Sequence, residues 1–223
     1  MNTLTVGDII ASVDRMLRTE NLPLTNTDKI EFVQEVVADL TATEDILWDD
    51  IDIATTTTSR TYTLPPEVKY VIGVWMRLSG GDYIELAPAP VRVVEDAAAN
   101  FTANTYSVLG RDLVLQRFPA TAHSAGLRVK VVRTHPNISS LNTLTADTLL
   151  PRVYKRLAAV MTTRRILESF LGDEAMNWIQ TLAQEEEMLR QRLPKATGRY
   201  GGLGMEKFAY ASRGVKQIAG GGG

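Results

Sequence analysis

The chain has 223 residues, of which 44% are hydrophobic and 22% are charged, and it contains no cysteine. This length predicts one domain, or one domain with a sizeable insertion, and it allows about 70% of the unfolded surface to be buried. The lack of cysteine excludes disulfide frameworks, thiolate zinc sites and cysteine nucleophiles. No apolar run reaches the roughly 20 residues of a membrane span and no signal peptide opens the chain, so we expect a soluble protein made in a reducing compartment.

The net charge of −2 conceals an uneven distribution along the chain. Residues 1–60 hold twelve acidic and four basic side chains, a balance of −8, and residues 61–193 hold thirteen acidic and fifteen basic ones, a balance of +2. Residues 194–223 hold one acidic and five basic side chains, a balance of +4. The chain therefore has an acidic head, a nearly neutral middle and a basic tail, and this asymmetry is a candidate basis for partner binding.

Two helices are predicted at the N-terminus. The first spans about residues 6–19, because its apolar residues recur at helical spacing on one stripe: Ile9, Ile10, Val13, Met16 and Leu17. The sequence NLPLTNT then interrupts the pattern, and Asn26 or Thr27 is the predicted N-cap of a second helix. That helix places Ile30, Val33, Val37 and Leu40 on one face and Asp28, Glu31, Glu35 and Asp39 on the solvated side. Together the two form a helical hairpin.

A β-rich segment follows, over roughly residues 47–149. From Trp48 the period is two, with Ile51 and Ile53 on one face and Asp50 and Asp52 on the other. Further strands are predicted at SRTYTLPP, KYVIGVWMR, YIELAP, TYSVLGRDLVLQRF (a hairpin turning at Gly110) and GLRVKVVRT. A short helix is predicted after Pro90, over VRVVEDAAAN.

Helix returns at Leu150–Pro151 and continues to Gly172, and a second long helix carries Ala175, Trp178, Ile179, Leu182 and Leu189 on one stripe. On the first of these helices the apolar face rotates, which predicts a change of packing partner within the fold or between subunits. From Pro194 no period survives. The predicted class is α+β: a helical bundle made of residues 1–46 and 150–193, a β-rich insert over 47–149, and an extended C-terminal arm over 194–223.

No residue pattern supports a metal, cofactor or catalytic site. The only histidines are His123 and His135, both in predicted loops, whereas a metal site needs two or three ligands at regular spacing. No nucleophile elbow and no phosphate-binding loop is present. The run of Glu185, Glu186 and Glu187 is interpreted as the solvated side of a helix. We therefore predict a protein that is not an enzyme and has no cofactor.

Two alternative functions remain open. A hydrolase would use the carboxylates of Asp49, Asp50 and Asp52, although a solvated strand edge protected by charge is the favoured interpretation of these residues. A nucleic-acid-binding protein would use the basic tail, where bases alternate with aromatic residues. The basic side chains of the helix that starts near Pro151 scatter around its circumference: Arg152, Lys155, Arg156, Arg164 and Arg165. They do not form a coherent phosphate-binding face.

The order of the elements resembles the tail tubular protein A family, the head-to-tail adaptors of short-tailed bacteriophages. The N-terminal hairpin leads into ILWDDIDIATT, and a strand ending in Leu-Pro follows in TYTLPPEVKYVI. The insert then continues with TYSVLGRDLVL and LRVKVVR. The C-terminal part is similar to the family's two helices and their short glycine and acidic joint, and GRYGGLGM resembles the Gly-Gly segment that comes after them.

The resemblance implies a structural protein of the virion neck, synthesised in the bacterial cytoplasm. It implies a ring, usually dodecameric, that docks on the portal protein, carries the tail nozzle or tail tube protein, and lets double-stranded DNA pass during packaging, retention and ejection. The implied portal-facing arm contains Arg199, Tyr200, Gly201, Gly202, Leu203, Phe208, Tyr210 and Arg213. No membrane contact is implied. If the acidic first 60 residues line the bore, they would repel DNA phosphates and keep the duplex from sticking.

Overall fold

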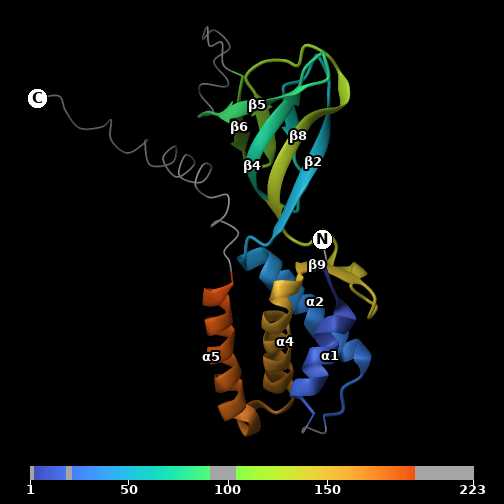
Figure 1. Ribbon diagram of the computed structural model, residues 1–223, viewed down its shortest axis with the longest axis vertical. Coiled ribbons are helices and arrows are strands. Elements are labelled where there is room, and N and C mark those ends of the chain that lie inside the picture. Colours follow the sequence, from blue (N-terminus) through green and yellow to red (C-terminus); the bar gives the residue numbers. More distant parts are fainter. Residues whose placement is uncertain (1–2, 19–21, 91–103, 194–223) are drawn as a thin grey trace, which may run out of the picture. The chain divides into compact units, whose positions relative to one another are not determined.

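The computed structural model describes residues 3–18, 22–90 and 104–193, and these residues form two compact units. The helical unit takes the described residues of Met1–Leu47 and Thr134–Lys195, and the β unit takes those of Trp48–Arg133. Figure 1 shows helices in the first and a curled sheet in the second, which confirms the α+β class. The predicted arm over 194–223 and the predicted helix after Pro90 lie outside the described residues.

Within the described residues the helical unit contains four α-helices. These are α1 (Val6–Met16), α2 (Asn26–Thr43), α4 (Lys155–Phe170) and α5 (Met176–Arg192). In Figure 1, α4 lies between α5 and the pair α1 and α2, and it packs against all three. The bundle prediction is correct only in part, because the unit also contains a two-stranded antiparallel sheet of β1 (Thr3–Thr5) and β9 (Asp147–Pro151). None of these helices is long and apolar enough to cross a membrane.

The first two helices begin at matching capping boxes. In α1 the Thr5 hydroxyl accepts a hydrogen bond from the Asp8 amide, and the Asp8 carboxylate accepts one from the Thr5 amide. In α2 the same exchange joins Thr25 and Asp28, so the predicted cap at Asn26 or Thr27 is wrong by one or two residues. The reason is the reciprocal Thr-x-x-Asp geometry, which satisfies two otherwise unpaired helix-end donors at once.

The long C-terminal helix begins later than the sequence predicts. Residues 147–151 pair with β1 as strand β9, a 3-10 turn follows at Arg152–Tyr154, and α4 starts at Lys155. Leu149 has φ of +60°, and the Asp147 carboxylate accepts a hydrogen bond from its amide at 2.8 Å. This left-handed residue lies in the middle of β9, where the pairing with β1 shifts register between Thr3 and Thr5, and helical periodicity alone does not reveal it.

The segment 134–149 belongs to the helical unit, whereas the sequence placed it with the β-rich insert. Its Leu141 is fully buried in the helical core, and its backbone oxygen accepts a hydrogen bond from the Gln34 side chain on α2. The Ala146 and Leu144 carbonyls accept hydrogen bonds from the first amides of α1. These non-local bonds attach an irregular segment to helices more than 100 residues away.

The apolar stripes of the two N-terminal helices form the core of the helical unit. Ile9, Val13, Val33, Val37 and Leu40 are all 0% exposed. On α4, buried residues lie on most of the circumference because the helix has neighbours on three sides. The rotation of its apolar face is therefore explained within the chain.

The β unit is a seven-stranded sheet in the order β2-β8-β4-β5-β6-β7-β3. Its strands are β2 (Leu47–Thr55), β3 (Thr61–Thr63), β4 (Val68–Arg77), β5 (Tyr83–Pro88), β6 (Thr105–Leu109), β7 (Asp112–Leu115) and β8 (His123–Arg133). The two edge strands, β2 and β3, are joined by only five residues, so the sheet must curl to bring its edges close together. Its interior is apolar and includes Val74, Leu113, Leu127, Val129 and Val131, each 0–5% exposed.

Two glycines allow close approaches in this unit. A Cβ atom on Gly126 of β8 would overlap the Thr55 side chain of β2, so only glycine fits there without a shift. A Cβ atom on Gly73 of β4 would lie 2.7 Å from the Trp75 ring, which therefore rests over the backbone of its own strand. Gly110 turns the β6–β7 hairpin with φ of +61°, as the sequence predicted.

Candidate functional site

The residues that the sequence assigned to a portal-facing arm are outside the described part of the chain. They are Arg199, Tyr200, Gly201, Gly202, Leu203, Phe208, Tyr210 and Arg213. The arm and its contacts remain a prediction. The site that the structure does describe lies in the helical unit, where charged side chains join helices that are far apart in sequence.

The carboxylates considered for a hydrolase lie on the edge strand β2. Asp49 forms an ion pair with Arg133 at 3.0 Å and Asp52 one with Arg128 at 3.2 Å, and Asp50 is exposed. A glycosidase-type pair needs one carboxyl group kept protonated and a second ionised at a set separation. Asp49 and Asp52 are each paired with a different arginine, and this arrangement does not favour that chemistry.

The two histidines do not meet. The His123 ring shares a hydrogen bond of 2.8 Å with the Thr121 hydroxyl in the β unit. In the helical unit, His135 is buried, its backbone amide donates to the Thr41 hydroxyl, and its Nδ1 accepts from the Asn137 amide. His123 is the first residue of strand β8, so its prediction as a loop residue is wrong, whereas His135 lies in a loop. The described residues contain no group of three or more His, Cys, Asp or Glu able to hold a metal ion.

The basic side chains of α4 point in several directions, as their spacing predicted. Lys155 lies 3.8 Å from Asp8 of α1, and Arg156 forms a two-bond contact with Glu185 of α5, at 2.7 and 3.0 Å. Arg164 and Arg165, which are adjacent in sequence, face α5 and α2 respectively. The helix therefore uses its cations to hold its neighbours, and they form no single phosphate-binding face.

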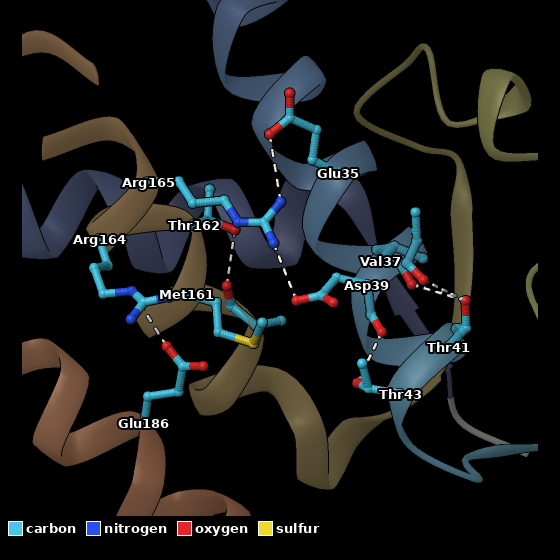
Figure 2. Close-up of polar contacts among 12 residues, drawn as sticks. Glu35, Val37, Asp39, Thr41, Thr43, Met161, Thr162, Arg164, Arg165 and Glu186 are labelled. Carbon is cyan, nitrogen blue, oxygen red and sulfur yellow. Dashed lines mark hydrogen bonds and ion pairs between the residues drawn. The ribbon is translucent and has the colours of Figure 1, made fainter. Parts of the chain in front are cut away.

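We call one set of these contacts the interhelical ion-pair cluster. It consists of Glu35, Asp39, Glu44, Arg164, Arg165, Glu168, Glu186 and Arg190. Figure 2 shows Arg165 of α4 reaching two carboxylates of α2, with N–O distances of 3.0 Å to Asp39 and 3.4 Å to Glu35. Since Glu35 and Asp39 are one helical turn apart, one guanidinium spans both and ties α4 to α2.

The other half of the cluster is centred on Glu186 of α5. Its carboxylate lies 3.3 Å from Arg164 of α4, a contact drawn in Figure 2, and 3.1 Å from Arg190 one turn further along α5. Arg190 also donates to Glu44, the residue after α2, at 2.8 Å. The cluster thus joins three helices, with α4 in the middle.

Glu186 corrects the interpretation of Glu185–Glu187 as a uniformly solvated face. Glu186 is 8% exposed and is the only buried carboxylate among the described residues, whereas Glu187 is exposed. The physical reason is position: Glu186 falls on the stripe of Leu182 and Leu189, four residues after one and three before the other. That spacing, together with Arg190 four residues later, is the sequence signal that could have identified it.

The outward face of the β sheet carries aromatic rings paired with cations. The Arg128 guanidinium lies 4.7 Å from the centre of the Tyr83 ring, and the Lys130 ammonium lies 5.8 Å from the Trp48 ring. The Tyr83 hydroxyl crosses β4 to donate to the Ala125 carbonyl of β8. These contacts, each within cation–π range, brace β2, β8 and β5 against one another.

Most of the acidic side chains of residues 1–60 form ion pairs with cations of the same chain. At least seven of the twelve acids form ion pairs, and six of these use cations from positions 128–190. The acids are Asp8, Asp14, Glu35, Asp39, Glu44, Asp49 and Asp52. The balance of −8 therefore overstates the negative potential that this part of the chain presents.

A comparison with models of known protein families identifies the family of this chain. The model of a protein family described as SU10 adaptor protein matches residues 4–205, which is most of the chain. The chain belongs to the SU10 adaptor family. The match includes both units of this family member, so the adaptor part of the predicted function is supported, while the resemblance to tail tubular protein A remains a proposal.

Two solved structures are weakly similar to this SU10 adaptor family member. One is a chain from the neck of an empty GTA particle computed with C6 symmetry, with 10% identity, a TM-score of 0.32, and coverage of 77% of this chain and 85% of that one. The other is from the neck of a native GTA particle computed with C12 symmetry, with 11% identity, a TM-score of 0.31, and coverage of 83% and 93%. No curated protein matches the chain.

Proposed function

We propose that the chain is a structural head-to-tail adaptor of a bacteriophage-type virion. The observation that carries this proposal is the match to an adaptor family over residues 4–205. In this role the chain forms a ring, dodecameric by the resemblance to tail tubular protein A, at the virion neck. The ring docks on the portal protein, holds a tail nozzle or tail tube protein, and surrounds the path of the double-stranded DNA.

The packing of the helical unit is compatible with such a ring. A closed ring uses two different faces of each subunit, so the folded subunit must stay rigid while both faces are engaged. The contacts of Arg165 with Glu35 and Asp39 and the buried stripes of α1 and α2 supply that rigidity for α1, α2 and α4. Since α4 packs on three neighbours of its own chain, the ring contacts are expected on other surfaces.

The arm over residues 194–223 is proposed as the portal contact. It holds five basic and one acidic side chain, with aromatic residues between them. Basic and aromatic side chains in this arrangement suit an acidic or apolar groove of a partner. The acidic residues of the head are proposed only as a weak barrier to DNA, because most of them face a cation of the same chain.

The experiment is size-exclusion chromatography with light scattering, on the full chain with and without its portal protein. We expect a ring-sized complex with the portal, and no such complex for a chain ending at residue 193. A full-length Arg199→Gln, Arg213→Gln variant is the matched test, because it keeps the arm and removes only two charges. A chain that ignores the portal contradicts the proposal.

The same preparation tests the alternatives. A hydrolase would keep activity after loss of the arm and lose it in Asp50→Asn or Asp52→Asn. A tail-driven DNA binder would bind duplex without the portal, with an affinity that falls steeply as salt rises. Either result would replace the adaptor proposal.

A further inference from the structure

Helix α5 is attached to the helical unit in a different way from α1 and α2. In α1 and α2 the contact is aliphatic, with four apolar residues of each helix at most 4% exposed: Val6, Ile9, Ile10 and Val13, and Val33, Val36, Val37 and Leu40. In α5 a single apolar residue, Leu182, is fully buried, and Trp178, Ile179 and Leu189 are only partly buried. Apolar burial therefore stabilises the docking of α5 less than that of α1 or α2.

Ion pairs supply the rest of the α5 contact. Arg156 of α4 holds Glu185 through two bonds, Arg164 of α4 lies beside Glu186, and Arg190 reaches Glu44. The Arg156 side chain is 55% exposed and Glu185 28%, so this pair is open to screening by salt. A helix held in this way can be released by competition for its charges without disturbing an aliphatic core.

The buried carboxylate makes this docking costly. Glu186 is removed from water, yet its Oε2 and the Arg164 Nε facing it make no hydrogen bond despite their 3.3 Å separation. Attraction to Arg164 and Arg190 recovers only part of the desolvation cost of this carboxylate, but removing its charge would leave both guanidinium groups without their counter-charge and weaken the docking further. Undocking would return both groups to water, which lowers the free energy needed to release α5.

The connection to α4 can accommodate such a movement. After α4 ends at Phe170, a single 3-10 turn, Gly172–Ala175, leads into α5. Gly172 has φ of +50°, a conformation that other residues adopt only with strain. No side-chain cap joins the first turn of α5 to the joint. A change of backbone angles at these few residues is enough to redirect the whole helix.

We propose that α5 is an electrostatic latch, which undocks from α4 as one helix, pivoting on residues 171–175, while α1, α2, α4 and the β1–β9 sheet stay folded. The chain continues from α5 into residues 194–223, so the docked or released state of α5 sets where the arm begins. This consequence for assembly rests on the proposed function. The release itself is a property of the isolated chain and is tested without any partner.

The test is amide hydrogen exchange of the full chain, resolved by helix, in the wild type and in Glu186→Gln. We expect the α5 amides to exchange at least tenfold faster in Glu186→Gln, while the α1 and α2 amides change less than twofold. Raising NaCl from 0.1 to 1 M should accelerate exchange in α5 of the wild type by about threefold, since the Debye length falls from about 10 to 3 Å. The matched control is Glu187→Gln, at an exposed neighbour whose carboxylate accepts a hydrogen bond from the Gln191 side chain one turn away, and it should leave α5 exchange unchanged.

A charge swap provides an independent measurement. Arg156→Glu should accelerate exchange in α5, and the double variant Arg156→Glu, Glu185→Arg should restore it, because the pair lies at the surface and can be reversed. The proposal is overturned if Glu186→Gln accelerates all helices equally, if it leaves α5 unchanged, or if Glu187→Gln has the same effect. Failure of portal binding with a salt-sensitive α5 would instead count against the adaptor function alone.

Discussion

The two units of this chain place their charges by different rules. In the β unit no charged side chain is buried among the described residues, and the ion pairs Asp52–Arg128 and Asp49–Arg133 lie on partly exposed sheet surface. In the helical unit Glu186 is buried, and ion pairs join residues that are far apart in sequence, as between Arg190 and Glu44, which are 146 positions apart. Among the described residues, the interior of the β unit therefore holds no charged side chain, whereas the helical unit has charged side chains at the contacts between its helices.

The difference follows from the geometry of the two kinds of element. Alternate residues of a strand point to opposite faces, so a period of two separates apolar from charged side chains completely. A helix also has positions at the boundary between its buried and exposed faces. On a helix with three neighbours, side chains at these boundary positions lie at the contacts with other helices. We therefore expect the stability of the β unit to depend on close packing, and the stability of the helical unit to depend on both apolar burial and ion pairs.

The largest effect is expected for Leu40→Ala in α2. Leu40 is 0% exposed, and its truncation leaves a cavity in the helical core that should cost about 2–5 kcal/mol of the free energy of unfolding. Urea unfolding followed by far-UV circular dichroism measures this, since the helices dominate that signal. Leu144→Ala, at a residue 42% exposed, is the control and should change stability by less than about 0.5 kcal/mol.

The next largest loss of stability tests whether the β unit depends on close packing. Gly126→Ala should destabilise it by about 1–3 kcal/mol, because the new methyl group overlaps the Thr55 side chain on the neighbouring strand. Trp48 and Trp75 both lie in this unit, so their fluorescence in a Trp178→Phe background reports its unfolding. Adding Thr55→Gly should recover part of the loss. No recovery would show that the overlap is not the cause.

A smaller loss of stability is expected when the ion pairs between α2 and α4 are removed. Arg165→Met removes the guanidinium and with it both ion pairs, which should cost about 1 kcal/mol of the free energy of unfolding at low salt and less as salt rises. Asp52→Asn in the β unit is the comparison, because that pair is 46% and 47% exposed and should contribute less. A salt-independent loss in Arg165→Met would mean that packing of the arginine stem, rather than charge, holds α4 against α2.

The smallest effect concerns the capping carboxylates. Hydrogen bonds from the Thr5 amide and then its hydroxyl hold the pKa of Asp8 below the usual value of 3.8, helped by Lys155 and Arg152 and opposed by partial burial. The Thr25 amide and hydroxyl likewise lower the pKa of Asp28. Because the folded pKa is the lower one, this stabilisation is present above about pH 3.8 and is lost as the pH falls through the folded value.

The measurement is the free energy of unfolding of the wild type and of Asp8→Asn and Asp28→Asn between pH 2 and 7. Each variant should be less stable than the wild type near neutral pH, and the difference should shrink below pH 3.8 as the wild-type carboxyl becomes protonated. A difference that stays constant down to pH 2 would show that the caps act through their geometry and not through their charge.

Local pattern was enough for much of the fold. Strand β8 follows from alternation of apolar residues and β4 from a β-prone apolar run. The turn at Gly110 follows from a glycine between two β-prone runs. The buried faces of α1 and α2 follow from helical spacing. In each case the signal lies within a few residues, because the periodicity of a single element is a local property.

The sequence alone determined the α+β class, the apolar faces of the helices, the absence of thiol chemistry and the uneven charge along the chain. Only the tertiary structure decided where those charges are neutralised, why α4 begins at Lys155, and that Glu186 is buried while its neighbours are not. The physical reason is that these outcomes depend on which distant residue lies opposite. Asp39 and Arg165 are 126 positions apart in sequence and 3.0 Å apart in the folded chain, and no local pattern contains that distance.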